Sequence, residues 1–146
     1  MHENEITRHR FWYSPGVTTG KSSKIARKAA ATSFLRLVAS GRIREAYASY
    51  VGPDMRHHNM AFAGDAASLE KAMEENHALY PHRILDIKQT LGDGDLVAVH
   101  SHVRLRPADA GFAVVHLFRF AGDRIVEMWD MVQAVPEESP NKNGMF

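Results

Sequence analysis

His116 and Asp130 are the two residues of this sequence whose surroundings most strongly suggest chemistry. Both lie in apolar runs, rich in Val, Ile, Phe and Trp, that flank the turn at Gly122-Asp123. Two such runs around a glycine-containing turn predict a long β-hairpin. An ionisable group among apolar side chains is costly unless it has a partner or a use. We therefore predict that His116 and Asp130 are catalytic.

The hairpin turn decides whether these two side chains share a face of the sheet. A two-residue turn would pair His116 with Trp129 and send Asp130 to the other face. A three-residue loop or a bulge would pair His116 with Asp130. The pattern alone leaves both registers open.

Two further histidines lie on the strand before this hairpin. Residues alternate between faces along a strand, so His100 and His102 should share one face. If the connecting loop is Pro107 to Gly111, Arg106 pairs with Phe112 and His102 comes opposite His116. The sequence then predicts a face with three histidines.

Three histidines and a carboxylate fit three kinds of site. One is a ligand pocket in which a histidine acts as acid, base or hydrogen-bond donor, and we favour this interpretation. A second is a hydrogen-bonded polar patch at a dimer surface. The third is a site for zinc, iron or nickel, which we rank last.

The elements that must position these residues can be read from periodicity and breaker residues. Apolar residues at helical spacing predict helices from Ser22 to about Gly41, from Arg42 to Tyr50 and from Ala67 to Leu79. A short strand should cover residues 54–59, where only one of His57 and His58 can face inward. From Ile84 the period becomes two, which predicts four strands: Ile84 to Leu91, Leu96 to Leu105, Ala113 to Ala121 and Arg124 to Ala134.

This order predicts an α+β fold in which three helices cover one face of a curved antiparallel sheet. At 146 residues the chain should form one domain over residues 21–146, preceded by an arm over residues 1–20. The arm carries Phe11-Trp12-Tyr13, which we expect to dock on the protein. The last two residues, Met145 and Phe146, should also pack back.

Composition and missing motifs exclude several classes of function. The net charge is +1 and there is no cysteine, which argues against nucleic acid as the main partner and rules out thiol chemistry. Glycine-rich nucleotide loops and the G-x-S-x-G and H-E-x-x-H motifs are absent, so we expect no cofactor. No apolar run is long enough to span a membrane, so we expect a cytoplasmic protein with no membrane partner.

With these residues laid out, the chain resembles the nuclear transport factor 2-like superfamily, and within it the SnoaL-like polyketide cyclase family. The resemblance rests on R-H-H-N at residues 56–59, D-L-V-A-V-H-S-H at 95–102, A-V-V-H-L-F-R-F at 113–120 and G-D-R-I-V-E-M-W-D-M-V-Q at 122–133. With the tail N-K-N-G-M-F, these segments are similar to a subgroup regarded as aldol-condensation enzymes. The resemblance implies a cone-shaped fold with an internal pocket and dimerisation through the outer sheet face.

The resemblance also implies roles for particular residues. Similar cyclases use an aspartate on the last strand as general base beside a histidine on the preceding strand, and these positions match Asp130 and His116. The pocket would further include the residues His58, Asn59, His100, His102, Phe118, Met128 and Tyr47. The resemblance thus implies proton abstraction next to a carbonyl, as in aldol condensation, cyclisation or isomerisation of a small apolar carbonyl compound.

Two alternatives remain open at the level of sequence. One is a non-catalytic ligand-binding or structural dimer of the same fold. The other is a metal-dependent enzyme that uses the histidines. For the homodimer we expect an outer face formed by Val97, Val99, Val103, Val115, Leu117, Trp129 and Met131.

Overall fold

A computed structural model describes residues 19–146, which form three helices and five strands. The predicted docking of Phe11-Trp12-Tyr13 falls outside the described residues. The helices are α1 (Thr19–Ala39), α2 (Ile43–Tyr50) and α3 (Ala66–Leu79). Each lies within a few residues of its predicted bounds. None of the helices in this part of the chain is long and apolar enough to cross a membrane.

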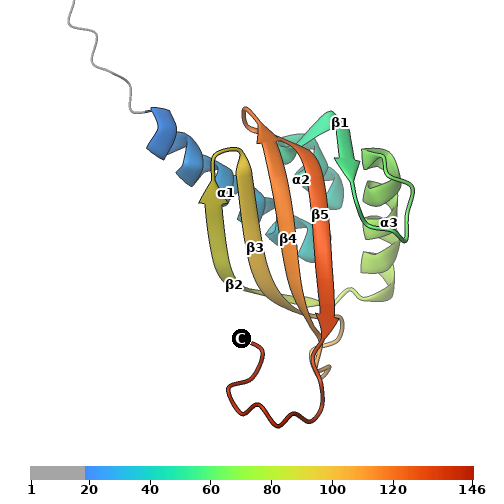
Figure 1. Cartoon of the computed structure of the whole chain (residues 1–146). Helices are drawn as coiled ribbons and strands as arrows, with labels where there is room; N and C mark the ends of the chain where they lie inside the picture. Colours follow the sequence, from blue (N-terminus) through green and yellow to red (C-terminus); the bar gives the residue numbers. More distant parts are fainter. Residues whose placement is uncertain (1–18) are drawn as a thin grey trace, which may run out of the picture.

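The strands form one sheet in the order β1-β5-β4-β3-β2 (Figure 1). Their bounds are β1 (Val51–His57), β2 (Ile84–Asp93), β3 (Leu96–Arg104), β4 (Phe112–Ala121) and β5 (Arg124–Ala134). The last four pair antiparallel as predicted. β1 instead pairs parallel with β5 at the edge, so the sheet is mixed rather than wholly antiparallel.

All three helices pack on one side of the sheet (Figure 1). The face toward the helices is called the inner face below, and the opposite one the outer face. Phe34 of α1 joins the layers, since its ring lies 5.5 Å from that of Tyr47 on α2 and 5.8 Å from that of Phe118 on β4. Val97, Val99 and Phe118 are almost completely buried there. The α+β fold with three helices on a curved sheet is therefore confirmed.

The β3–β4 register differs from the prediction and reverses the faces of β3. The connection spans residues 105–111, and Val103 pairs with Phe112. His102 therefore pairs with Ala113, and the residue opposite His116 is Val99. The observed pairing differs from the predicted one by an odd number of residues. Such a shift sends every side chain of a strand to the other face. The predicted face with three histidines is wrong for this reason.

Contacts within the β3–β4 connection explain its length. Gly111 has φ +80°, and a Cβ atom there would lie 2.4 Å from the backbone oxygen of Val103. The side chain of Asp109 accepts a hydrogen bond from the backbone N–H of Arg106 at 3.1 Å. These contacts fold Arg106 into the turn instead of the strand. The same shift places Val97, Val99 and Val103 on the inner face, so they are not part of a dimer surface.

The β4–β5 hairpin settles the register that the sequence left open. A bulge follows Arg119, and beyond it His116 pairs with Asp130 and Phe118 with Met128. The extra residue of a bulge changes which side chains are opposite each other. His116 and Asp130 therefore share the inner face.

The C-terminal tail packs back on the outer face, as predicted. The ring of Phe146 stacks on His102 at 4.4 Å and on His100 at 5.7 Å. The ammonium group of Lys88 lies 5.4 Å from the centre of the same ring. The two outward histidines thus pack against the last residue of the chain.

Candidate functional site

Asp130 and His116 form the centre of the candidate site. They lie opposite each other on β5 and β4, and both are partly buried. Burial lowers the pKa of His116 to about 4, and the nearby carboxylate of Asp130 opposes this shift. Desolvation disfavours the charged form of an imidazole, so the ring is neutral at pH 7. A neutral imidazole can donate one hydrogen bond and accept another.

Asn59 holds the carboxylate of Asp130 from the far side. Its side-chain nitrogen donates a hydrogen bond to Oδ2 of Asp130 at 2.8 Å. Its side-chain oxygen accepts one from the backbone N–H of Ala61 at 3.0 Å. The second bond fixes which end of the amide points at Asp130. The predicted pocket residue Asn59 is therefore in contact with the predicted base.

The two adjacent histidines of the R-H-H-N segment face opposite ways. His57 is 5% exposed and shares the inner side of β1 with Met55. His58 points to the outer face, where its Nε2 lies 2.8 Å from Glu127 and its ring stacks on Trp129 at 4.9 Å. The predicted pocket contact of His58 does not fit this placement. The alternation of side chains along a strand required one of the two to face outward.

His100 and His102 are also absent from the site. Both lie on the outer face with Phe146, and Nε2 of His102 lies 2.7 Å from the backbone oxygen of Ala110. The β3 register explains their displacement. Across residues 19–146, no three His, Cys, Asp or Glu side chains are grouped so that they could hold a metal ion. The histidine cluster invoked for a metal site therefore does not form.

Phe118 and Met128 lie on the inner face next to His116 and Asp130. They pair with each other across the hairpin, and the next pair on the same face is His116 and Asp130. Phe118 is fully buried and Met128 is 6% exposed. The imidazole of His116 lies 6.0 Å from the Phe118 ring and nearly parallel to it. One side of the pair is therefore lined by buried apolar side chains.

Ser101 is a buried polar residue close to the pair on the inner face. It is 0% exposed on the inner side of β3 and pairs with Val114, two residues before His116. Its hydroxyl oxygen and Nδ1 of His116 are both buried without a hydrogen-bond partner among the described residues. A serine among valines could have been noticed, but only the correct β3 register brings it to the inner face.

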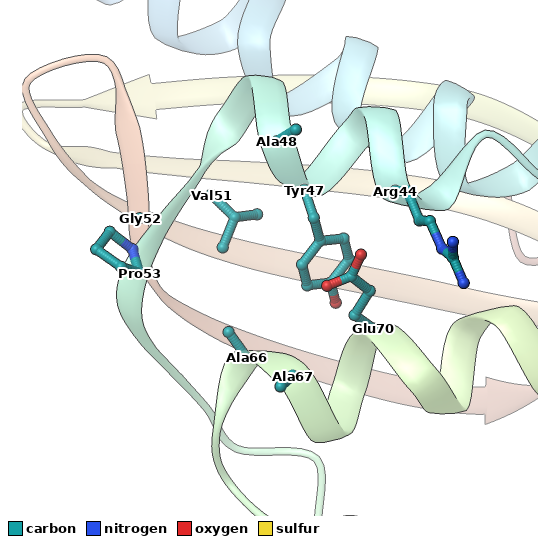
Figure 2. A pocket seen from close by; sticks show the side chains of 9 residues that line it. All are labelled: Arg44, Tyr47, Ala48, Val51, Gly52, Pro53, Ala66, Ala67 and Glu70. Carbon is teal, nitrogen blue, oxygen red and sulfur yellow. The ribbon is translucent and has the colours of Figure 1, made fainter.

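Tyr47 lines a different hollow. A groove of about 370 Å³ lies between α2, β1 and the start of α3, and Tyr47, Glu70 and Arg44 supply its polar groups. Figure 2 shows the Tyr47 ring reaching from α2 toward α3, with the carboxylate of Glu70 beside its hydroxyl end. Burial raises the pKa of Tyr47, and Glu70 raises it further. Asp130 and His116 do not line this groove, so Tyr47 is separate from the pair.

A carboxylate, a neutral imidazole and an amide beside apolar side chains can move a proton. A carboxylate can accept it, and a neutral imidazole can donate a hydrogen bond to a developing negative charge. Such interactions are stronger where water is excluded. The site therefore has the groups needed for acid–base chemistry.

A family model for the SnoaL-like domain matches residues 31–128. The chain belongs to the SnoaL-like family. The match runs from Ala31, within α1, to Met128 and so includes β4 with His116, while Asp130 lies two residues beyond it. The predicted relationship to SnoaL-like proteins is thus confirmed.

Solved structures support the same fold. The chain is 20% identical to AclR, a candidate hydroxylase from Streptomyces galilaeus, over 76% of this chain and 91% of that one, with a TM-score of 0.65. It is 19% identical to a candidate ketosteroid isomerase from Kribbella flavida, over 82% and 87%, with a TM-score of 0.65. A candidate polyketide cyclase from Acidithiobacillus ferrooxidans is 21% identical over 74% and 88%, with a TM-score of 0.60. No curated protein matches. At these identities the likeness shows the fold alone.

Proposed function

We propose that this SnoaL-like protein abstracts a proton next to a carbonyl group, with Asp130 as general base. The observation that carries the proposal is the pairing of Asp130 with His116 on the inner face, with Asn59 bound to the carboxylate. A histidine whose pKa is strongly lowered and that lies opposite a carboxylate is typical of functional sites. The solved structures named as an isomerase and a cyclase share the fold.

The three residues would divide the work. The carboxylate of Asp130 takes the proton from the carbon next to the carbonyl. His116, neutral because its pKa is lowered to about 4, donates a hydrogen bond to the enolate oxygen as charge builds there. Asn59 fixes the carboxylate through one oxygen, which leaves the other free for the substrate.

The substrate would be a small, largely apolar carbonyl compound. The neighbours of the pair are Phe118 and Met128, which are buried, apolar and uncharged. Proton abstraction in such a site can lead to an intramolecular aldol condensation or to a shift of a double bond. A general base of this kind contributes about 10²–10⁴-fold to the rate.

Hydrogen–deuterium exchange tests this proposal before the natural substrate is known. The protein is incubated in D₂O with a panel of small cyclic and aromatic ketones, and loss of the α-proton signals is followed by NMR. We expect catalysed exchange in at least one ketone, and less of it in His116→Phe. His100→Phe is the matched control, since His100 lies on the outer face. Exchange that is the same in His116→Phe would contradict the proposal.

The outer face favours a second candidate, a dimer that binds a ligand or has a structural role. Leu117 and Trp129 pair across β4 and β5 on this face, and Met131 beside them is 53% exposed. Apolar side chains gathered on one sheet face are typical of an interface between subunits. A dimer is also compatible with an enzyme, so the exchange experiment decides between the two candidates and the oligomeric state does not.

A further inference from the structure

The loop between β1 and α3 carries Asn59 and is closed at its base. The backbone N–H of His57 donates a hydrogen bond to the oxygen of Gly64 at 3.1 Å, and Arg56 forms a β-bridge with Asp65. Asp65 then caps α3 by accepting a hydrogen bond from the backbone N–H of Ser68 at 2.9 Å. The loop is thus anchored at both ends to regular structure.

The side chain of His57 lies inside this loop and bonds to it twice. Its Nδ1 lies 3.3 Å from the backbone nitrogen of Asn59, and its Nε2 lies 2.6 Å from the backbone oxygen of Ala63. A backbone N–H can only donate and a carbonyl oxygen can only accept. Nδ1 must therefore accept, and Nε2 must carry the proton. Both contacts are satisfied only by the neutral ring with its proton on Nε2.

We propose that His57 is a positioning residue that holds Asn59 in place against Asp130. The proposal rests on the proposed function, because it concerns the site in which Asp130 would act as base. His57 is 5% exposed and has no direct hydrogen bond to Asp130. It acts through the loop.

The contacts form a continuous chain from His57 to the carboxylate. Nδ1 of His57 fixes the backbone of Asn59, and the N–H of Ala61 fixes the oxygen of the Asn59 side chain. The amide nitrogen then donates to Oδ2 of Asp130 at 2.8 Å. Asp130 itself is held by pairing of β5 with β4. The distance between the two side chains therefore depends on the position of the loop. The side chain of His57 helps to fix that position, together with the backbone hydrogen bond that the N–H of His58 donates to the oxygen of Met128 at 2.9 Å.

A purely structural role for His57 makes a different prediction. A buried histidine that only fills space and satisfies the loop would affect stability when replaced. It would not matter which of its two nitrogens is imitated by the new side chain. A positioning role requires that the acceptor next to Asn59 be kept, because that contact sets the position of the amide.

Two substitutions separate the contacts of the ring. In His57→Asn the side-chain oxygen can take the place of Nδ1 and accept from the N–H of Asn59, while the bond to Ala63 is lost. In His57→Gln the longer side chain can keep a donor for the oxygen of Ala63, while the acceptor for Asn59 is lost. His58→Gln is the matched control, since it makes the same change at the neighbouring histidine, whose ring lies on the outer face beside Glu127.

The experiment measures how fast the side-chain amide protons of Asn59 exchange with water, by ¹H–¹⁵N NMR on the full chain. In the wild type we expect slow exchange. We also expect the ¹⁵N chemical shifts of the His57 ring to be those of the tautomer with its proton on Nε2. His57→Gln should make the amide exchange as fast as an exposed asparagine, and His57→Asn and His58→Gln should retain most of the protection. An Asn59 amide that stays protected in His57→Gln, or a wild-type ring with its proton on Nδ1, would overturn the proposal.

Activity distinguishes this proposal from the proposed function. With a ketone that undergoes exchange, His57→Gln should lower kcat by up to roughly 100-fold with little change in KM, because misplacing a catalytic group mainly affects the chemical step. An equal loss of kcat in His57→Asn, or a change in KM alone, would count against positioning. Two results together would separate the proposals: loss of Asn59 protection in His57→Gln, and full exchange activity in Asp130→Asn. They would support the positioning role of His57 and reject Asp130 as the base.

Discussion

At the scale of single residues, the site depends on the different environments of His116 and Asn59 around one carboxylate. His116 meets Asp130 from the neighbouring strand and is neutral because burial lowers its pKa to about 4. Asn59 meets the same carboxylate from a loop. The carboxylate of Asp130 thus lies between two uncharged side chains, and it is not one half of a salt bridge. This distinction has measurable consequences for stability.

The first consequence is a pH dependence of stability. The unfolded chain has the ordinary histidine pKa of 6.5, while folded His116 has a pKa of about 4. Between these values the unfolded state binds more protons, so the free energy of unfolding falls as the pH drops from about 6.5 to about 4. His116 accounts for at most about 3 kcal/mol of this loss. Urea unfolding at pH 7 and pH 5 measures it.

The variant His116→Phe isolates this contribution from that of the other histidines. It removes the titrating group and keeps a flat ring beside Phe118. The difference in unfolding free energy between the two pH values should therefore be smaller in the variant than in the wild type. Equal pH dependence in both proteins would show that folded His116 titrates as an ordinary histidine.

Replacement of Asp130 by asparagine also tests whether His116 is neutral. Asp130→Asn should change the free energy of unfolding by less than about 1 kcal/mol, because it leaves no buried imidazolium and can still accept a hydrogen bond from Asn59. If Asp130 were instead the ion-pair partner of a charged His116, the change would cost about 3–5 kcal/mol. Thermal and urea unfolding of the two proteins at pH 7 discriminates between these outcomes.

At the scale of elements, the connections decide which side chains meet. The sequence correctly predicted β4 and β5, because two long apolar runs flank a clear turn at Gly122-Asp123. It failed at the β3–β4 connection, because Arg106 belongs to the turn and alternation alone cannot show where a strand ends. One odd-numbered shift there put His100 and His102 on the outer face and Ser101 on the inner face.

The α1–α2 connection offers an element-scale prediction. Gly41 has φ +85°, and a Cβ atom there would lie 2.3 Å from Nε2 of His77 on α3. Gly41→Ala should therefore combine backbone strain of about 1–2 kcal/mol with an overpacking cost of about 1–3 kcal/mol. Gly122→Ala is the matched control, since Gly122 has φ +59° and nothing within 4 Å of its added Cβ. Urea unfolding should show a clearly larger loss for Gly41→Ala, and equal losses would mean that His77 moves aside freely.

At the scale of the whole molecule, the topology was only partly open to prediction. Helices first and strands afterwards indicated the α+β fold, which the structure and the family match confirm. The parallel pairing of β1 with β5 was not predicted, because it joins segments that are far apart in the chain and has no local signal. That pairing brings the R-H-H-N segment beside Asp130, so the contact with Asn59 required the full fold.

The two faces of the sheet predict how copies of the molecule associate. Leu117, Trp129 and Met131 lie on the outer face, and we expect this face to form a homodimer. Met131→Glu should convert the dimer to a monomer, because a charge placed in an apolar interface loses its hydration. Val132→Glu is the control, since Val132 is similarly exposed but lies on the inner face. Light scattering at micromolar concentration measures the mass, and a monomeric wild type would reject the interface.

The measurement that most directly tests the central claim is the rate of α-proton exchange in Asp130→Asn. It is made in D₂O with a ketone that the wild type turns over, on protein whose unfolding free energy matches that of the wild type. If Asp130 is the general base, exchange should fall by about 10²–10⁴-fold, because the amide cannot accept the proton. An exchange rate in Asp130→Asn within a few-fold of the wild-type rate would contradict the assignment of Asp130 as the base.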